Sequence, residues 1–386
     1  MRTYSLRSPL LAVSALLGLL ACSAFIGDPT HVSRTAAYVI LALAPGAALY
    51  LLFEREPSLL ELSLAACVLS PVITAAGGSL FILAGLSPAL AGDILLAVVF
   101  ALWIVALAIR PREYRVAFSG RQLFLLLGTI LFLCAVVGYL PLAKSFWRYT
   151  SDAWFHNAVV AQIDAFGLPP TDPYFAGLDL QYMWAYHVLI LTLSKAARID
   201  PTIVMTMINV QGLAALVLAT FAVSVQLKPR FAYGWFASIT VIFGLNAVVW
   251  AFLPIKLIRA MTGDVTGWAE IVRNYTLVPF DRVTIWAFLT VAENPAFLLD
   301  KFITVTAFGL GLALMVASLW GILVALSNRR PFAYVMVATS VFGTIVFHTV
   351  VGIVTIGAAL GGLIALSLRR KENTGPVPGT IRNLVL

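Results

Sequence analysis

The chain has 386 residues, of which 61% are hydrophobic and only 11% are charged. A soluble domain of this size would carry far more charge on its surface, so the composition excludes a soluble globular protein and indicates a polytopic membrane protein. The net charge of +8 follows from basic residues beside apolar runs, as in membrane proteins generally, and does not indicate nucleic-acid binding.

Apolar runs long enough to cross a bilayer recur along the chain. A run of about 20 such residues spans the hydrocarbon core as a helix, and we count about ten runs. The runs cover residues 9–27, 35–53, 58–85, 91–109, 122–142, 202–227, 231–253, 302–326, 332–347 and 350–367. The third contains Pro71 and the pair Gly77-Gly78, so we expect a kinked or broken helix whose freed backbone groups bond to neighbouring helices. The predicted fold class is an all-α polytopic membrane protein.

Basic residues beside the apolar runs set the expected orientation, because Lys and Arg are retained on the cytoplasmic side. Most of them fall on one side if the N-terminus is cytoplasmic and residues 182–198, "YMWAYHVLILTLSKAAR", do not cross. Aromatic residues open this segment, and Lys195 and Arg198 close it, which is typical of a helix lying in the membrane interface. The expected location is the plasma or inner membrane, with the intervening loops outside the cytoplasm.

This topology divides the chain into six parts. We expect N-terminal membrane helices, a first external loop with juxtamembrane helices, a transmembrane pair, a second external loop, C-terminal membrane helices and a cytoplasmic tail. Their bounds are 1–142, 143–201, 202–253, 254–301, 302–371 and 372–386.

The first external loop concentrates titratable residues. Thr150 and Ser151 are good helix caps, and Asp152 falls in the first turn of a helix predicted to reach about Phe166, where the helix dipole favours a carboxylate. His156 follows Asp152 at a spacing of four residues, so both side chains share a face. They could address one substrate, or Asp152 could only cap the helix while His156 lies at a wet interface.

Two further loop residues allow two readings each. Gly167 is expected to end the helix, and the prolines after it favour an extended path towards Asp172. Asp172 is either a functional acid or the first residue of an Asx turn. His187 lies in an aromatic segment and is either a site residue or part of the interfacial aromatic belt.

The stretch "DAWFHNAVVAQIDAFGLPPTDPYFAG" followed by "YMWAYHVL" resembles the first external loop of the GT-C glycosyltransferases. These polytopic enzymes include the oligosaccharyltransferase catalytic subunit and the protein and lipid-A glycosyltransferases. The resemblance implies transfer of a sugar from a polyprenyl-phosphate donor to a lipid, glycan or protein acceptor at the extracytoplasmic face. It also implies that Asp152 acts as general base or metal ligand, that Asp172 matches the aspartate of the later DP motif, and that His187 matches a polar position.

The chain departs from that family in three respects. About five predicted spans precede the loop acid instead of one, and the large C-terminal soluble domain of the family has no counterpart. Ala153 follows Asp152, so there is no adjacent acidic pair. A divalent cation, Mg²⁺ or Mn²⁺, held by Asp152 and Asp172 is therefore an open question, and no other cofactor is expected.

Other polar residues complete the predicted site. A phosphate-linked lipid is a leaving group that needs cations, and arginine holds phosphate through paired hydrogen bonds. The second external loop offers such cations, although each could instead contact lipid headgroups. Glu293 is either a second site acid or a helix cap, and His348 lies at the outer edge of two short spans. The predicted substrate-binding residues are His156, His187, Arg273, Arg282, Glu293, Lys301 and His348.

Two other function classes stay open. A transporter or flippase for lipid-linked substrates would place acids near the middle of its spans, whereas Asp93 lies near a span end and no other acid lies well inside one. A non-catalytic assembly subunit could keep the same loop without turnover.

Overall fold

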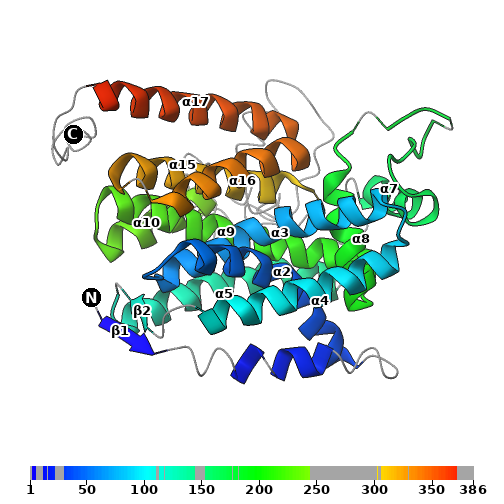
Figure 1. Cartoon of the computed structure of the whole chain (residues 1–386), viewed down its shortest axis with the longest axis horizontal. Coiled ribbons are helices and arrows are strands. Elements are labelled where there is room, and N and C mark those ends of the chain that lie inside the picture. Colours follow the sequence, from blue (N-terminus) through cyan, green and yellow to red (C-terminus); the bar gives the residue numbers. More distant parts are fainter. Residues whose placement is uncertain are drawn as a thin grey trace, which may run out of the picture.

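The computed structural model describes residues 2–5, 12–14, 16–21, 30–109, 113–116, 118–143, 153–175, 177–180, 182–243, 302, 306–328 and 330–371. Helices dominate this part of the chain, and the long ones run roughly parallel along the long axis of the molecule (Figure 1). They are α2 (His31–Phe53), α3 (Leu59–Leu83), α4 (Pro88–Ile109), α5 (Gly120–Ala143), α7 (Ala153–Phe166), α8 (Ala185–Ala197), α9 (Pro201–Leu227), α10 (Phe231–Phe243), α15 (Phe308–Asn328), α16 (Pro331–Phe347) and α17 (Thr349–Lys371).

The described helices confirm an all-helical membrane protein. Five of them, α2, α3, α4, α9 and α15, are long and apolar enough to cross a membrane. Shorter apolar stretches lie in α5, α10, α16 and α17, and each overlaps a run that the sequence marks as a span. The number of spans and the side of the membrane on which each loop lies stay predictions.

The parallel helices give the bundle two ends. We call one the clamp end; it holds the α2–α3 turn, the α15–α16 turn and a short sheet of β1 (Arg2–Ser5) and β2 (Glu113–Val116). We call the other the histidine end; it holds α7, α8 and the α16–α17 turn (Figure 1). The antiparallel pairing of β1 with β2 joins the start of the chain to the α4–α5 connection, which the hydrophobicity pattern did not predict.

A proline inside α2 frees a carbonyl group that α3 occupies. Pro45 has no backbone N–H, so the carbonyl of Leu41 lacks its usual helical donor. The Thr74 hydroxyl of α3 donates to this carbonyl at 2.8 Å. One residue further along α2, the backbone N–H of Gly46 donates to the Ser70 hydroxyl at 2.8 Å. The two helices are thereby bonded backbone to side chain in the apolar interior.

Gln211 of α9 adds two hydrogen bonds to this α2–α3 contact, and we call the whole set of bonds the joint. Pro71 removes the usual donor to the carbonyl of Cys67, and the Gln211 Nε2 group donates to that carbonyl at 3.1 Å. The same Nε2 group donates at 2.7 Å to the carbonyl of Ala42, whose normal partner, the N–H of Gly46, is engaged elsewhere. The expected satisfaction of freed groups by a neighbouring helix is confirmed, and α3 is continuous through Pro71 instead of broken.

Helix α8 is packed inside the bundle, a burial that the sequence did not predict. Nearly all of its residues are buried. Close approach is possible because α3 and α4 present glycines: a Cβ at Gly78 would collide with the Thr192 hydroxyl, and one at Gly92 would lie 3.1 Å from the backbone N of Ala196. With 13 residues, α8 is about 20 Å long and too short to cross.

Candidate functional site

Helix α7 builds one wall of the histidine end. It runs from Ala153 to Phe166 and ends at Gly167, whose φ of +82° is the left-handed conformation expected at that position. Its buried face comprises Ala153, His156, Val159, Val160 and Ile163, in agreement with the predicted periodicity. His156 therefore points into the protein and not toward a wet surface.

His156 meets His187 of α8 in a buried pair. Nδ1 of His156 lies 2.9 Å from Nε2 of His187, and the two residues are 1% and 0% exposed. One ring nitrogen must donate and the other accept, so the accepting imidazole is unprotonated at that nitrogen. Burial, reinforced by the nearby His156, lowers the pKa of His187 to about 3. The pair joins residues 31 positions apart in the chain.

Aromatic rings surround the pair. The Phe155 ring centroid lies 6.1 Å from that of His187, and the Tyr186 centroid lies 5.5 Å from that of His156. Tyr182 is 6.0 Å from His187. Burial raises the pKa of Tyr186, and the neighbouring Tyr182 adds to this rise. His187 is therefore held in a setting that disfavours its protonation.

His348 lies at the same end, in the turn between α16 and α17. Its ring centroid is 5.3 Å from that of Phe308, and burial lowers its pKa. The adjacent backbone N–H of Thr349 donates at 2.8 Å to the sulfur of Met183, which precedes α8. His31, the first residue of α2, also lies at this end. All four histidines of the chain therefore gather at one end.

Asp172 forms a turn in the structure. Its Oδ1 atom accepts hydrogen bonds from the backbone N–H groups of Tyr174 at 2.8 Å and Phe175 at 3.2 Å. The backbone N–H of Asp172 donates to the carbonyl of Leu178 at 2.8 Å. This is the Asx-turn alternative allowed by the sequence, and a catalytic role for Asp172 stays a prediction.

Several buried polar atoms at the histidine end have no hydrogen-bond partner in the part of the chain that the structure describes. They are Nε of Arg34, the hydroxyls of Tyr38 and Tyr186, Nδ1 of His187 and the hydroxyl of Thr192. Arg34 and Tyr38 were not among the site residues predicted from the sequence. A cation and a hydroxyl one turn apart near the start of an apolar helix were the available signal.

The remaining predicted site residues, Asp152, Arg273, Arg282, Glu293 and Lys301, lie outside the described residues. Within the described ranges, no three His, Cys, Asp or Glu side chains lie close enough to hold a metal ion. A cation shared by Asp152 and Asp172 stays a prediction, because Asp152 is not described.

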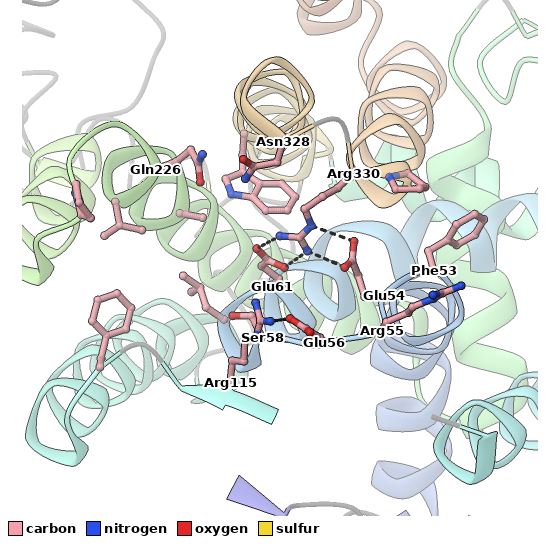
Figure 2. A pocket seen from close by; sticks show the side chains of 17 residues that line it. Phe53, Glu54, Arg55, Glu56, Ser58, Glu61, Arg115, Gln226, Asn328 and Arg330 are labelled. Carbon is pink, nitrogen blue, oxygen red and sulfur yellow. Dashed lines mark hydrogen bonds and ion pairs between the residues drawn. The ribbon is translucent and has the colours of Figure 1, made fainter. Parts of the chain in front are cut away.

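The clamp end contains a cavity. A cavity of about 900 Å³ lies between the α2–α3 turn, the C-terminal ends of α9 and α15, and the β2–α5 connection (Figure 2). Its lining includes three arginines and three glutamates, together with Gln226, Asn328 and Trp320. Its size is that of a ligand pocket, but most of its charges are already paired.

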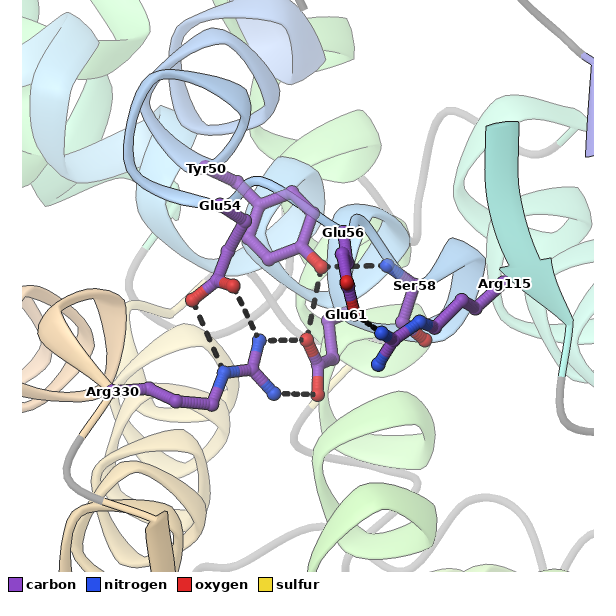
Figure 3. Close-up of polar contacts among 7 residues, drawn as sticks. All are labelled: Tyr50, Glu54, Glu56, Ser58, Glu61, Arg115 and Arg330. Carbon is purple, nitrogen blue, oxygen red and sulfur yellow. Dashed lines mark hydrogen bonds and ion pairs between the residues drawn. The ribbon is translucent and has the colours of Figure 1, made fainter. Parts of the chain in front are cut away.

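Arg330 is the centre of this pairing (Figure 3). Its Nη1 and Nη2 atoms donate to the two carboxylate oxygens of Glu61 at 2.9 and 2.6 Å, and its Nε donates to Glu54 at 3.2 Å. The Tyr50 hydroxyl donates to Glu61 at 2.9 Å and accepts from the backbone N–H of Ser58 at 2.8 Å. The α15–α16 turn is thus bound to the α2–α3 turn.

The electrostatics of this cluster are those of a structural ion pair. Arg330 is flanked by two carboxylates, which raise its pKa despite burial. Burial raises the pKa of Glu54, and Arg330 opposes that rise. Arg115 of β2 pairs with Glu56 at the edge of the same cavity. Ion pairs therefore connect the α2–α3 turn both to the α15–α16 turn and to β2.

Comparison with family models, with curated proteins and with solved structures finds no match to this chain. The resemblance to GT-C enzymes accordingly rests on the loop sequence alone.

Proposed function

We propose that the protein is a membrane glycosyltransferase that transfers a sugar from a polyprenyl-phosphate donor to a lipid, glycan or protein acceptor at the extracytoplasmic face. The observation that carries the proposal is the buried His156–His187 pair. It fixes the loop helix α7 against α8, one helical turn after Asp152.

In the proposed reaction, Asp152 is the general base and polyprenyl phosphate is the leaving group. Asp152 accepts the proton of the acceptor hydroxyl, whose oxygen bonds to the anomeric carbon of the sugar. The bond between that carbon and the phosphate oxygen breaks, and polyprenyl phosphate leaves with the electron pair. The histidine pair positions the face of α7 on which Asp152 is predicted to lie, so His156 and His187 act as positioning residues.

The alternative of a transporter or flippase has one observation in its favour. The cavity at the clamp end lies on the opposite side of the bundle from the loop helices, as a vestibule in a transport protein would. The paired state of its acids argues for a structural role instead, because an ion-coupling acid must be able to exchange its partner.

Transfer of labelled sugar from polyprenyl-phosphate donors in proteoliposomes tests the proposal. Asp152→Asn should abolish transfer with unchanged yield of folded protein. Asp172→Asn is the matched control, because asparagine also forms Asx turns; retained activity assigns Asp172 to the turn, and lost activity assigns it to the reaction. Equal transfer by wild type and Asp152→Asn removes Asp152 from the mechanism. Absence of transfer in both favours the transporter or assembly-subunit class.

A further inference from the structure

The histidine end contains a cation, Arg34, that has no counter-ion among the residues that the structure describes. Arg34 lies in the first turn of α2 and is half-buried. Within the described part of the chain its guanidinium makes no hydrogen bond or ion pair, and its Nε atom is buried. The positive end of the helix dipole makes this a poor place for an arginine unless an anion is bound there.

Two tyrosine hydroxyls, like Arg34 Nε, are buried and have no hydrogen-bond partner among the described residues. Tyr38 follows Arg34 by four residues, so both side chains lie on one face of α2. Helix α2 packs against α8, and Tyr186 of α8 lies close enough to Tyr38 for an ionised phenolate at one to affect the other. They are 6% and 1% exposed, and neither hydroxyl has a partner among the described residues. A buried hydroxyl without a partner is destabilising, so two of them, together with an arginine that has no described partner, point to a missing acceptor.

We infer that Arg34, Tyr38 and Tyr186 form a binding site for the phosphate group of a membrane lipid. A guanidinium and hydroxyl donors suit phosphate oxygens, and the first turn of a membrane-crossing helix lies at the depth of lipid headgroups. The inference deepens the proposed function and rests on it for the identity of the lipid, an isoprenoid phosphate. The Tyr186 ring touches His156, so a phosphate bound here lies beside the loop helix α7.

Binding measured without any sugar keeps this inference separable from the transfer reaction. The full-length protein in nanodiscs would be titrated with an isoprenoid phosphate, with the matching isoprenoid alcohol and with inorganic phosphate, using thermal stabilisation and tryptophan fluorescence as readouts. We expect the isoprenoid phosphate to bind at least tenfold more tightly than the alcohol. Arg34→Gln should weaken that binding about tenfold, and Tyr38→Phe and Tyr186→Phe by a few-fold each.

Two further variants keep the test decisive. Arg34→Lys retains the charge and should restore part of the affinity, and the tyrosine variants remove only unpaired hydroxyls, so they should fold. Arg121→Gln, at an exposed arginine of α5 near the clamp end, is the matched control and should bind as the wild type does. Equal binding by wild type and Arg34→Gln overturns the site, and so does equal binding of phosphate and alcohol. Inorganic phosphate binding as tightly as the lipid overturns the lipid assignment. Phosphate binding without sugar transfer would retain the site and reject the transferase.

Discussion

Arg330 and Arg34 lie at opposite ends of the same bundle and differ in whether their guanidinium groups are paired with described carboxylates. Arg330 donates to Glu61 and Glu54 and is buttressed through Tyr50. Arg34 is half-buried, beside tyrosine hydroxyls that are also unpaired in the described part of the chain. The clamp end has a cavity of about 900 Å³, but most of its charged groups already satisfy one another. Unsatisfied polar groups are therefore a better guide to a binding site here than cavity size.

The largest expected effect comes from removing the clamp arginine. Arg330→Gln leaves Glu54 and Glu61 partly buried without a cation and should lower the free energy of unfolding by about 3 kcal/mol. Arg34→Gln should change it by less than about 0.5 kcal/mol because no ion pair is lost. Denaturation of the two purified variants in detergent measures the difference. Similar losses in both would show that the two arginines have the same role.

Acidification tests the buried histidine pair. The folded-state pKa of His187 is about 3, below its ordinary value of 6.5, so the unfolded chain binds more protons between these values. The stability contributed by His187 is complete above pH 6.5 and is lost as the pH falls; at pH 5 the loss is about 2 kcal/mol. His187→Asn should flatten the fall in melting temperature between pH 6.5 and 5. At the clamp end, the raised pKa of Glu54 acts in the opposite direction, because protonation favours its folded state.

A pair of hydroxyl deletions compares the two ends directly. Tyr50→Phe removes the links to Glu61 and to the backbone of Ser58 and should cost about 1.5 kcal/mol. Tyr38→Phe removes a buried hydroxyl with no described partner, so stability should stay within about 0.5 kcal/mol of wild type or rise. A loss in Tyr38→Phe as large as in Tyr50→Phe would mean that the Tyr38 hydroxyl is bonded within the protein.

The smallest effect is expected at the joint between the two ends. Gln211→Leu removes the donor to the carbonyls of Ala42 and Cys67 and should lower stability by about 1 kcal/mol, the scale of interhelical hydrogen bonds in membranes. Gln226→Leu, on the same helix but without a partner in the described ranges, is the control. An unchanged unfolding transition in Gln211→Leu would show that α2 and α3 tolerate the freed carbonyls.

The sequence predicted the local parts of this structure better than the contacts between them. The apolar runs and the capped, periodic helix α7 follow from neighbouring residues, and the structure has helices in those places. His156 and His187 were both selected as candidates, but their direct contact depends on how α8 packs between glycines of α3 and α4. The interfacial placement of α8 stays a prediction; its burial among the other helices was not foreseen, because an aromatic start and a basic end are equally compatible with a buried helix.

Charged residues were the hardest to interpret. Glu54, Glu61 and Arg330 fit the expected charge pattern of loops, and nothing in their spacing along the chain reveals that they meet. Arg34 appeared to be one more flanking charge. Only the three-dimensional arrangement distinguishes Arg330 from Arg34. Arg330 pairs with a glutamate more than 260 positions away in the chain, whereas Nε of Arg34 has no partner among the described residues.

The joint at Gln211 also has a consequence for biogenesis. When α2 and α3 have been synthesised, Thr74 can already occupy the carbonyl of Leu41, but the carbonyls of Ala42 and Cys67 wait for a residue 144 positions beyond Cys67. Until α9 enters the membrane, the nascent hairpin lacks the Gln211 donor for these two carbonyls in an apolar medium, where an unpaired backbone group is destabilising. The hairpin therefore depends on the insertion machinery or on water for that interval, and its final packing is reached only after the second half of the chain begins to insert.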